Sequence, residues 1–327
     1  MFGLYSLFAL AAGFIIDAAV GDPHGLPHPV ALMGRLITML EKLLRRAFPK
    51  TARGENAAGA ALWLIVCALS FLIPAAVLML FYHISSWLGL AAESVMCWQC
   101  IAARSLCRES MNVKAALDSG DIPASRRAVS MIVGRDTDSL DDHGIARAAV
   151  ETVAENASDG VIAPLLFLAI GGGPLGMFYK AVNTMDSMLG YIEEPYKDFG
   201  LVPAKADDVF NFVPARLSAP FLLLSGGILG FDMKNGLRIF RRDRYRHASP
   251  NSAQTESVMA GLLGLRLAGN AWYHGVLHEK EFIGDPVREI EHDDIRRANV
   301  IMYAAAVLSL LVFLGLRLCV LFLINAV

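Results

Sequence analysis

The chain has 327 residues and a formal net charge of −2; 55% of its residues are hydrophobic and only 18% are charged. Soluble globular domains carry roughly 45–50% apolar and about 25% charged residues, so this composition indicates a membrane protein. Nothing in it provides the basic surface that nucleic acids require, and we expect no nucleic-acid partner.

Three segments are apolar over the ~20 residues that a membrane-spanning helix needs, namely residues 1–20, 57–82 and 301–327. The first lacks the basic n-region and cleavage site of a signal peptide, so we interpret it as a retained span. Three others are shorter or interrupted, and their status stays open: 84–103, 161–178 and 217–231. The five cysteines predict no disulfide scaffold, and Cys97 and Cys100 are interpreted as small buried side chains.

The orientation follows from basic residues near the span ends, which mark cytoplasmic loops. Segments 21–56, 104–160 and 232–300 carry them and are predicted to be cytoplasmic. The polar segment 179–216 lies between apolar runs of only about ten and about eight residues before Gly- and Pro-rich breaks, too short to cross a bilayer. We therefore predict two broken, protein-buried helices and a segment that reaches the cytoplasmic side.

Most of the remaining sequence has helical spacing, notably residues 109–130 and 144–157, and no alternation predicts strands. The G-x-G-x-x-G at residues 171–176 predicts a helix break, because no strand precedes it as in a dinucleotide site. The predicted fold is an all-α, polytopic helical membrane protein with helical cytoplasmic loops and some broken or re-entrant helices. Residues 1–327 are expected to form one integral membrane domain.

Polar residues cluster first in "GRDTDSLDDHGIARAAVETVAENASDG", residues 134–160. Gly134 would permit a close backbone approach, and Arg135 has a planar fork suited to phosphate or carboxylate. The four-residue spacing of Arg147, Glu151, Glu155 and Asp159 predicts one polar helical stripe, and an ordinary amphipathic surface helix is the alternative.

Further polar residues recur in "YKAVNTMDSMLGY", "DDVFNFVPARL" and "RHASPNSAQTESVMAG". An N-cap is the simplest role for Asn251. His274 and His278 are four residues apart but have no nearby third ligand, so we interpret them as ordinary histidines.

These stretches, with "GDPHGLPHPVALMGRLI" near the N-terminus, closely resemble the adenosylcobinamide-phosphate synthase family of cobalamin biosynthesis (CbiB/CobD type) from about residue 13 to residue 300. The resemblance implies a multi-pass enzyme of the cytoplasmic membrane that joins adenosylcobyric acid to (R)-1-aminopropan-2-ol or its O-phosphate. ATP and Mg²⁺ are consumed, giving adenosylcobinamide or its phosphate. It also suggests a cytoplasmic active site and association with later enzymes of nucleotide-loop assembly.

That chemistry suggests a role for each matching residue. Mg²⁺ prefers carboxylate oxygens together with substrate phosphates, and an attacking amine needs a base. The predicted catalytic residues are Glu151, Glu155, Asp22 and His28. The predicted metal ligands are Asp136, Asp159, Asp186, Asp207 and Asp208. The predicted substrate- and nucleotide-binding residues are Gly134, Arg135, Thr137, Asn156, Lys180, Asn183, Asn211, Arg216, His247, Asn251 and Glu256.

Two other functions remain as alternatives. An intramembrane polyprenyl transferase also holds Mg²⁺ with Asn/Asp clusters, but two clusters would suffice and five motifs are present. An ion-coupled transporter would explain Asp17, Glu93 and the broken segments, but matching halves are not found.

Overall fold

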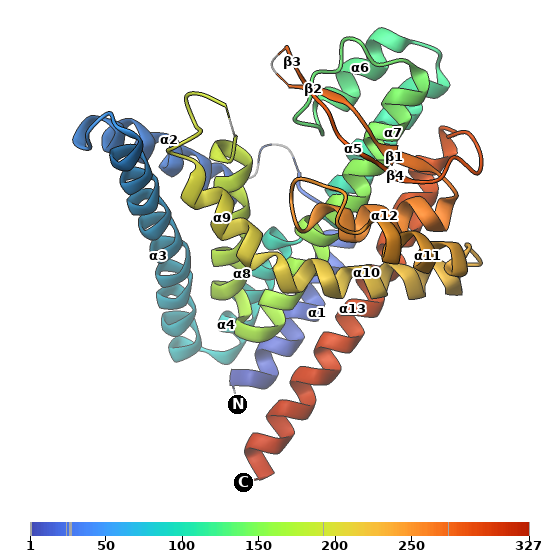
Figure 1. The fold of residues 1–327 in the computed structure, drawn as a ribbon. Coiled ribbons are helices and arrows are strands. Elements are labelled where there is room, and N and C mark those ends of the chain that lie inside the picture. The colour runs from blue at the N-terminus through green and yellow to red at the C-terminus, as the bar shows by residue number, and fades with distance from the viewer. Residues whose placement is uncertain (1, 24, 26–27, 192, 274, 327) are drawn as a thin grey trace. The chain divides into compact units, whose positions relative to one another are not determined.

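The computed structural model describes residues 2–23, 25, 28–191, 193–273 and 275–326, and it is mainly helical, which confirms the predicted fold class (Figure 1). Contacts divide the chain into two compact units. The first comprises residues 1–102, 164–211 and 312–327, and the second comprises residues 103–163 and 212–311. That residues 1–327 act as one catalytic domain stays a prediction.

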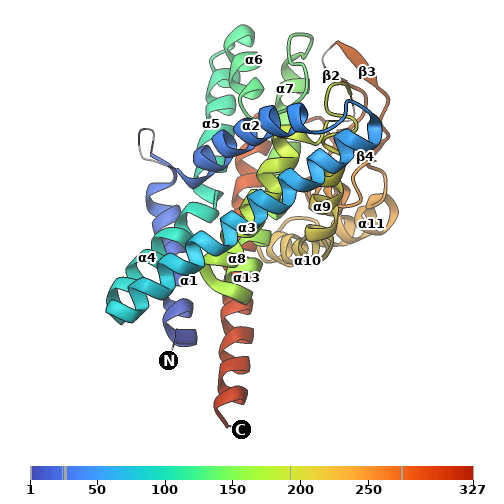
Figure 2. The same ribbon diagram turned by 90° about the vertical axis from the view of Figure 1, so that its left-hand side faces the viewer.

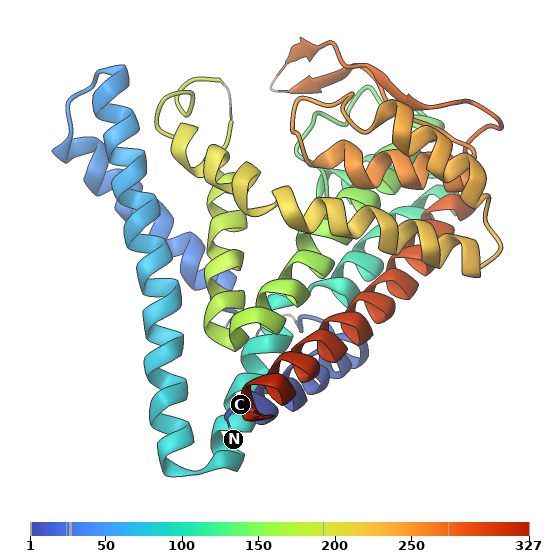
Figure 3. The same cartoon turned by 60° about the horizontal axis from the view of Figure 1, so that its bottom comes forward.

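The first unit is built from helices, most of them apolar, with the amphipathic α2 as the exception. It contains α1 (Phe2–Val20), α2 (Pro29–Ala47), α3 (Ala52–Ile84), α4 (Ser86–Cys100), α9 (Leu201–Phe210) and most of α8 (Ala163–Leu189). α1 packs along α4 (Figure 2), and α3 packs against α2, α4 and α9. The chain reverses between α3 and α4 at Ser85 (Figure 3), whose hydroxyl accepts a hydrogen bond from the Trp87 amide at 3.3 Å and so caps α4.

The described part of the chain contains four helical segments that are long and apolar enough to cross a membrane. α1, α3 and α13 (Asp293–Ala326) coincide with the three predicted spans, and the fourth runs from Asp142 to Leu189. α9 and α10 (Phe212–Ile228), separated at Asn211, raise the number to five if together they make one broken span. α4 has 15 residues, which at a rise of 1.5 Å gives about 22 Å, so by itself it is shorter than the ~30 Å hydrocarbon core.

The predicted break in 161–178 is present inside α8. Gly171 and Gly172 leave helical geometry, and Gly172 has φ +65°, which favours glycine. Glu93 of α4 accepts a hydrogen bond from the Gly173 amide at 3.3 Å, and Tyr82 donates to its second oxygen at 2.7 Å. This buried carboxylate therefore replaces a helical acceptor lost at the break, which removes one of the observations that favoured a transporter.

The predicted break in 217–231 is wrong, because α10 continues as a helix through Gly226. A Cβ at Gly226 would lie 2.5 Å from Leu262. The small residue is thus required by close helix packing and does not interrupt the helix. The interruption lies before this segment, at Asn211.

The second unit surrounds a buried helix. It contains α5 (Ala103–Asp118), α6 (Ile122–Ser130), α7 (Asp142–Asn156), the π-helix η1 (Ala157–Ile162), α10, α11 (Met233–Asp243), α12 (Ser252–Leu263) and most of α13. Every residue of α12 is buried, and the helix packs against α7, α10 and α11 (Figure 1). A Cβ at Gly261 would lie 2.7 Å from Gly236 of α11, so these glycines allow the close crossing.

Short strands follow α12, which the sequence did not lead us to expect. β1 (Arg266–Ala268) pairs antiparallel with β4 (Phe282–Gly284), and β2 (Ala271–Tyr273) pairs antiparallel with β3 (Val276–His278). Each strand has only three residues, too few for a period of two to stand out. The available signal was two apolar or aromatic triplets separated by two residues that include Gly275.

Candidate active site

A polar pocket of about 130 Å³ lies in the second unit among α7, α12 and the segment of short strands. The structure brings seven of the predicted residues to its wall, namely Gly134, Arg135, Glu151, Glu155, Asn156, His247 and Glu256. They come from two of the motifs, so tertiary folding joins residues up to 122 positions apart, from 134 to 256. Gly134 faces open space at its Cα, and its expected close approach to a bound group stays a prediction.

Arg135 and Glu151 form an ion pair whose side chains are only 14% and 11% exposed. The second oxygen of Glu151 accepts a hydrogen bond at 2.6 Å from the amide of Ala268, a non-glycine residue with φ +58°. Such left-handed backbone is costly for alanine and persists where its surroundings hold it. Both oxygens of Glu151 are thus engaged, which makes it a weaker candidate for the base than predicted.

Glu256 lies on α12 and is 5% exposed. Its Oε2 has no hydrogen-bond partner among the described residues. Burial, followed by the negative charges of Glu155 and Glu151, raises the pKa of Glu256 well above its usual value of 4.5. Glu155 accepts a hydrogen bond from Ser252 at 2.8 Å through one oxygen. The pocket therefore holds a carboxyl group that keeps its proton to a higher pH than an ordinary glutamate does.

His247 contributes an imidazole of defined tautomer. Its Nδ1 accepts a hydrogen bond from the Ser249 amide at 3.0 Å, so the neutral ring carries its proton on Nε2. Burial lowers the pKa of His247, and the charge of Lys280 adds to this effect while that of Glu155 opposes it. At neutral pH the ring is a hydrogen-bond donor through Nε2.

Tyr273 and Lys280 also line the pocket and were missed by the sequence analysis. The Lys280 ammonium donates to the Tyr273 hydroxyl at 2.8 Å. Both residues belong to the strand segment, and a lone lysine or tyrosine there carries no local signal of a site. Their role is visible only once the strands fold back onto α7.

Other predicted residues of this unit lie outside the wall of the pocket. Asp136 holds the β2–β3 hairpin, since its amide donates to the Trp272 carbonyl at 2.8 Å and its carboxylate accepts from the Gly275 amide at 2.8 Å. The next residue, Thr137, is buried. Asn251 stands at the N-cap of α12 without capping it, and its side chain accepts from Arg216 at 3.3 Å. The simple N-cap interpretation is therefore wrong.

Only two of the four residues in the predicted polar stripe line the same pocket. Glu151 and Glu155 share the pocket, but Arg147 lines a different pocket and Asp159 lies in η1. Four residues advance a helix by about 40° more than one full turn, so a stripe at this spacing drifts around the axis. Over three such steps the outer residues face elsewhere.

In the first unit, Asp22 and His28 form an ion pair at 3.3 Å. The half-buried Lys180 lies within electrostatic reach of Asp22, so these three predicted residues are neighbours. The Nδ1 atom of His28 also accepts from the Val30 amide at 3.3 Å and caps α2. A capping role therefore accounts for part of the first motif.

A second polar group of this unit is buried. The Tyr179 hydroxyl donates to Asn211 at 2.6 Å, and the Asn211 amide donates to Asp207 at 2.9 Å. Asp208 instead lies 3.5 Å from Lys205. Adjacent residues on a helix point about 100° apart, so Asp207 and Asp208 have different neighbours.

Asn183 and Asp186 lie on α8 in the first unit, and the Gly190 amide donates to the Asp186 carbonyl at 2.7 Å. His274 lies outside the described residues, and the ring of His278 packs edge-on against Tyr273 with centroids 5.1 Å apart. Within the described ranges, no group of three or more His, Cys, Asp or Glu side chains is placed to hold a metal ion.

The comparison with known proteins places the chain in a family. The family model described as CobD/Cbib protein matches residues 10–302. The chain is 44% identical over 315 residues to the cobalamin biosynthesis protein CobD of Clostridium perfringens, covering 96% of this chain and 99% of that protein. It is 46% identical over 312 residues to CobD of Klebsiella pneumoniae (95% and 98% covered) and 43% identical over 312 residues to CbiB of Salmonella arizonae (95% and 98% covered). No solved structure gives a significant match. The chain therefore belongs to the CobD/Cbib protein family.

Proposed function

We propose that this protein acts in cobalamin biosynthesis as a membrane-bound ligase. It joins the free carboxylate of adenosylcobyric acid to (R)-1-aminopropan-2-ol or its O-phosphate, using ATP and Mg²⁺. The printed names of the relatives support the pathway. The resemblance of the motifs supports the reaction. The observation that carries the proposal is the buried, unpartnered carboxyl oxygen of Glu256 in a pocket that also holds Glu155, His247 and Lys280.

The pocket suits the reacting groups and not the whole substrates. Pockets for drug-sized ligands have volumes of about 300–1,000 Å³, whereas this one measures about 130 Å³. A small amine and an activated carboxyl group would fit, while the corrin ring and the nucleoside would lie outside. The carboxylate of Glu155 favours the entry of the amine as its ammonium ion.

Amide formation requires the amine to lose its proton and the carboxylate to acquire a leaving group. In the proposed sequence, the substrate carboxylate attacks the γ-phosphorus of ATP, giving an acyl phosphate and ADP. The amine nitrogen then attacks the acyl carbon, and phosphate leaves. Glu256 accepts the amine proton, because its raised pKa makes it a better base than an ordinary glutamate. Lys280 and the Nε2–H of His247 would stabilise the phosphate charge.

Glu155 and the side-chain oxygen of Asn156 are the oxygen ligands that the pocket offers to Mg²⁺ bound on ATP phosphates. The ion would neutralise phosphate charge. Arg135 is already neutralised by Glu151, and we assign this pair a positioning role that fixes the wall of the pocket around Ala268. The same reaction places the site on the cytoplasmic side, where ATP is available.

The direct test uses the purified full chain in detergent with adenosylcobyric acid, Mg-ATP and each amine in turn, with the amide product identified by mass. We expect a product with one or both amines and none without ATP. Glu256→Gln should form much less amide product than the wild type. Glu279→Gln is the matched control, since Glu279 is exposed and outside the pocket wall. A folded wild-type protein that forms neither amide under these conditions would refute the proposal.

A further inference from the structure

The second unit contains a larger pocket that the proposed reaction does not use. Its volume is about 480 Å³, against about 130 Å³ for the pocket of Glu256. Four basic side chains line it: His143, Arg147, Arg266 and Arg288. The wall also includes Glu289 and apolar residues such as Leu265 and Val287.

Two of these arginines have no carboxylate partner. Arg147 forms no hydrogen bond or ion pair within the described chain, and its Nε atom is buried. Arg266 lies over the Phe282 ring at 4.3 Å and forms no ion pair with any described residue. A partly buried cation without a counter-ion is unfavourable, so Arg147 points to an anion that binds there, and the exposed Arg266 adds a second guanidinium at the same wall.

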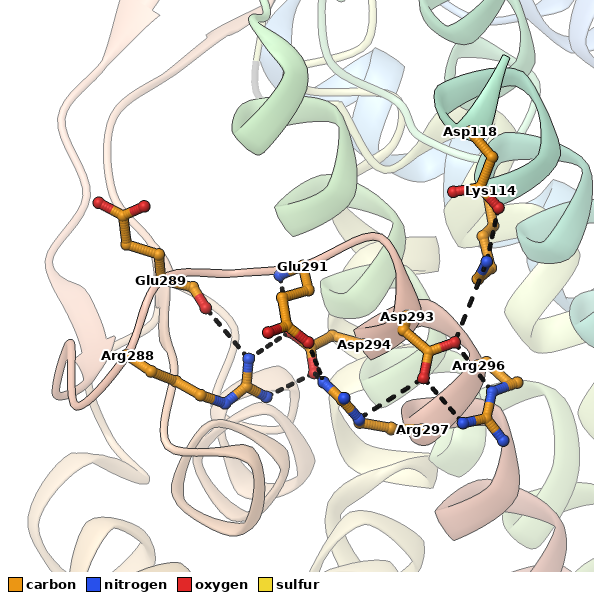
Figure 4. Close-up of polar contacts among 9 residues, drawn as sticks. All are labelled: Lys114, Asp118, Arg288, Glu289, Glu291, Asp293, Asp294, Arg296 and Arg297. Carbon is orange, nitrogen blue, oxygen red and sulfur yellow. Dashed lines mark hydrogen bonds and ion pairs between the residues drawn. The ribbon is translucent and has the colours of Figure 1, made fainter. Parts of the chain in front are cut away.

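The third arginine is held in place by its neighbours. Asp294 accepts from Arg288 at 2.7 Å and from Arg297 at 2.8 Å, so one buried carboxylate is shared by two guanidinium groups (Figure 4). Arg288 also donates to the Glu289 carbonyl at 3.0 Å, while the Glu289 carboxylate points away from the guanidinium in Figure 4. Arg288 donates to Asp294 through both terminal nitrogens, and Arg297 is also paired with Glu291 and Asp293, so the orientation of Arg288 is fixed.

We propose that His143, Arg147, Arg266 and Arg288 bind a phosphate or polyphosphate group. Guanidinium forks match the paired oxygens of phosphate, and three of them favour an anion with more than one negative charge. His143 lies in the first turn of α7, where the helix dipole adds to the attraction. The site goes beyond the proposed reaction, because its residues are not among those that surround Glu256. The phosphate could belong to a soluble compound or to a lipid headgroup.

The test measures binding by the full chain in detergent, without Mg²⁺, and compares inorganic phosphate, tripolyphosphate and sulfate. Tripolyphosphate should raise the melting temperature of the wild type and bind at least tenfold more tightly than sulfate. Arg147→Gln and Arg266→Gln should each weaken that binding by about tenfold or more. Arg127→Gln should bind as the wild type does, because Arg127 is an exposed arginine outside the pocket.

A second arm uses vesicles of phosphatidylcholine with or without phosphatidic acid. Loss of binding in the two variants on phosphatidic acid alone would assign the site to a lipid headgroup, and loss on tripolyphosphate would assign it to a soluble ligand. If one variant fails to fold, the other still decides the result. Equal affinities of wild type and both pocket variants for every phosphate probe, or no binding of any probe, would overturn the proposal.

Discussion

Replacing Glu256 by glutamine separates the catalytic and structural consequences of its burial. The substitution keeps the size of the side chain but removes the carboxyl proton and the negative charge. If Glu256 accepts the amine proton, kcat should fall by about 10²–10⁴, the usual contribution of a general base. The KM for ATP should change little, because the pocket does not hold the nucleoside.

The same substitution should stabilise the fold. A buried polar group without a partner costs about 1–3 kcal/mol, and more when it is charged. Glu256 is 5% exposed and its Oε2 has no partner among the described residues. Glutamine retains a buried polar atom but not the charge, so we expect the free energy of unfolding to rise by about 1 kcal/mol at alkaline pH. That corresponds to a melting temperature about 2–4 °C higher for a domain of 150–250 residues.

The pH dependence has a definite sign. The folded protein raises the pKa of Glu256 above 4.5 through burial, so above pH 4.5 the folded state retains a proton that the unfolded state releases. Wild-type stability from this group is fully present below pH 4.5 and falls as the pH rises through the folded pKa. The Glu256→Gln variant has no carboxyl group at this position to titrate, so it does not lose this stability as the pH rises. The gain in melting temperature should therefore be near zero at pH 4.5 and largest at pH 8.

The assay is a thermal melt of wild type, Glu256→Gln and the control Glu279→Gln at a series of pH values, with amide formation measured on the same samples. Activity should fall while the melting temperature rises, and only in Glu256→Gln. Full activity in that variant would remove Glu256 from the chemistry. A gain in melting temperature that does not depend on pH would contradict the assignment of a buried, titrating carboxyl.

Four further predictions concern other parts of the molecule. Glu151→Gln should destabilise the fold by about 3–5 kcal/mol, because it leaves Arg135 buried without its partner; an unchanged urea midpoint would contradict this. Asp186 is a metal ligand predicted from the sequence that lies outside the proposed pocket; loss of amide formation in Asp186→Asn at normal membrane abundance would support that role, and full activity would exclude Asp186 from the metal site. Excess chelator should stop product formation, and product formed in its presence would rule out the Mg²⁺ requirement. Cysteine placed at Ser187 or Lys197, both exposed, in a background without native cysteines should label only from the cytoplasmic side. Labelling in intact cells by an impermeant reagent would place the segment outside.

The sequence alone was sufficient for features that depend on neighbouring residues. Long apolar runs define α1, α3 and α13, and the glycines at 171–173 mark the break in α8, because hydropathy and backbone freedom are local properties. The order of five motifs was also enough to indicate the family, which the comparisons confirm.

The arrangement of the site depended on contacts between distant residues. Glu151 is held by the Ala268 amide, 117 positions away, and so loses the freedom that a base needs. Arg147 heads the stripe in the sequence but turns to another pocket, because the spacing of four residues drifts around the helix. Lys280 enters the wall because the segment of short strands folds back on the helices, with β1 against α7 and β4 against α12, and three-residue strands carry too little periodicity to be recognised. Residue types and helical periods thus determine which groups are available, whereas burial and long-range hydrogen bonds determine which of them share a pocket and in which protonation state.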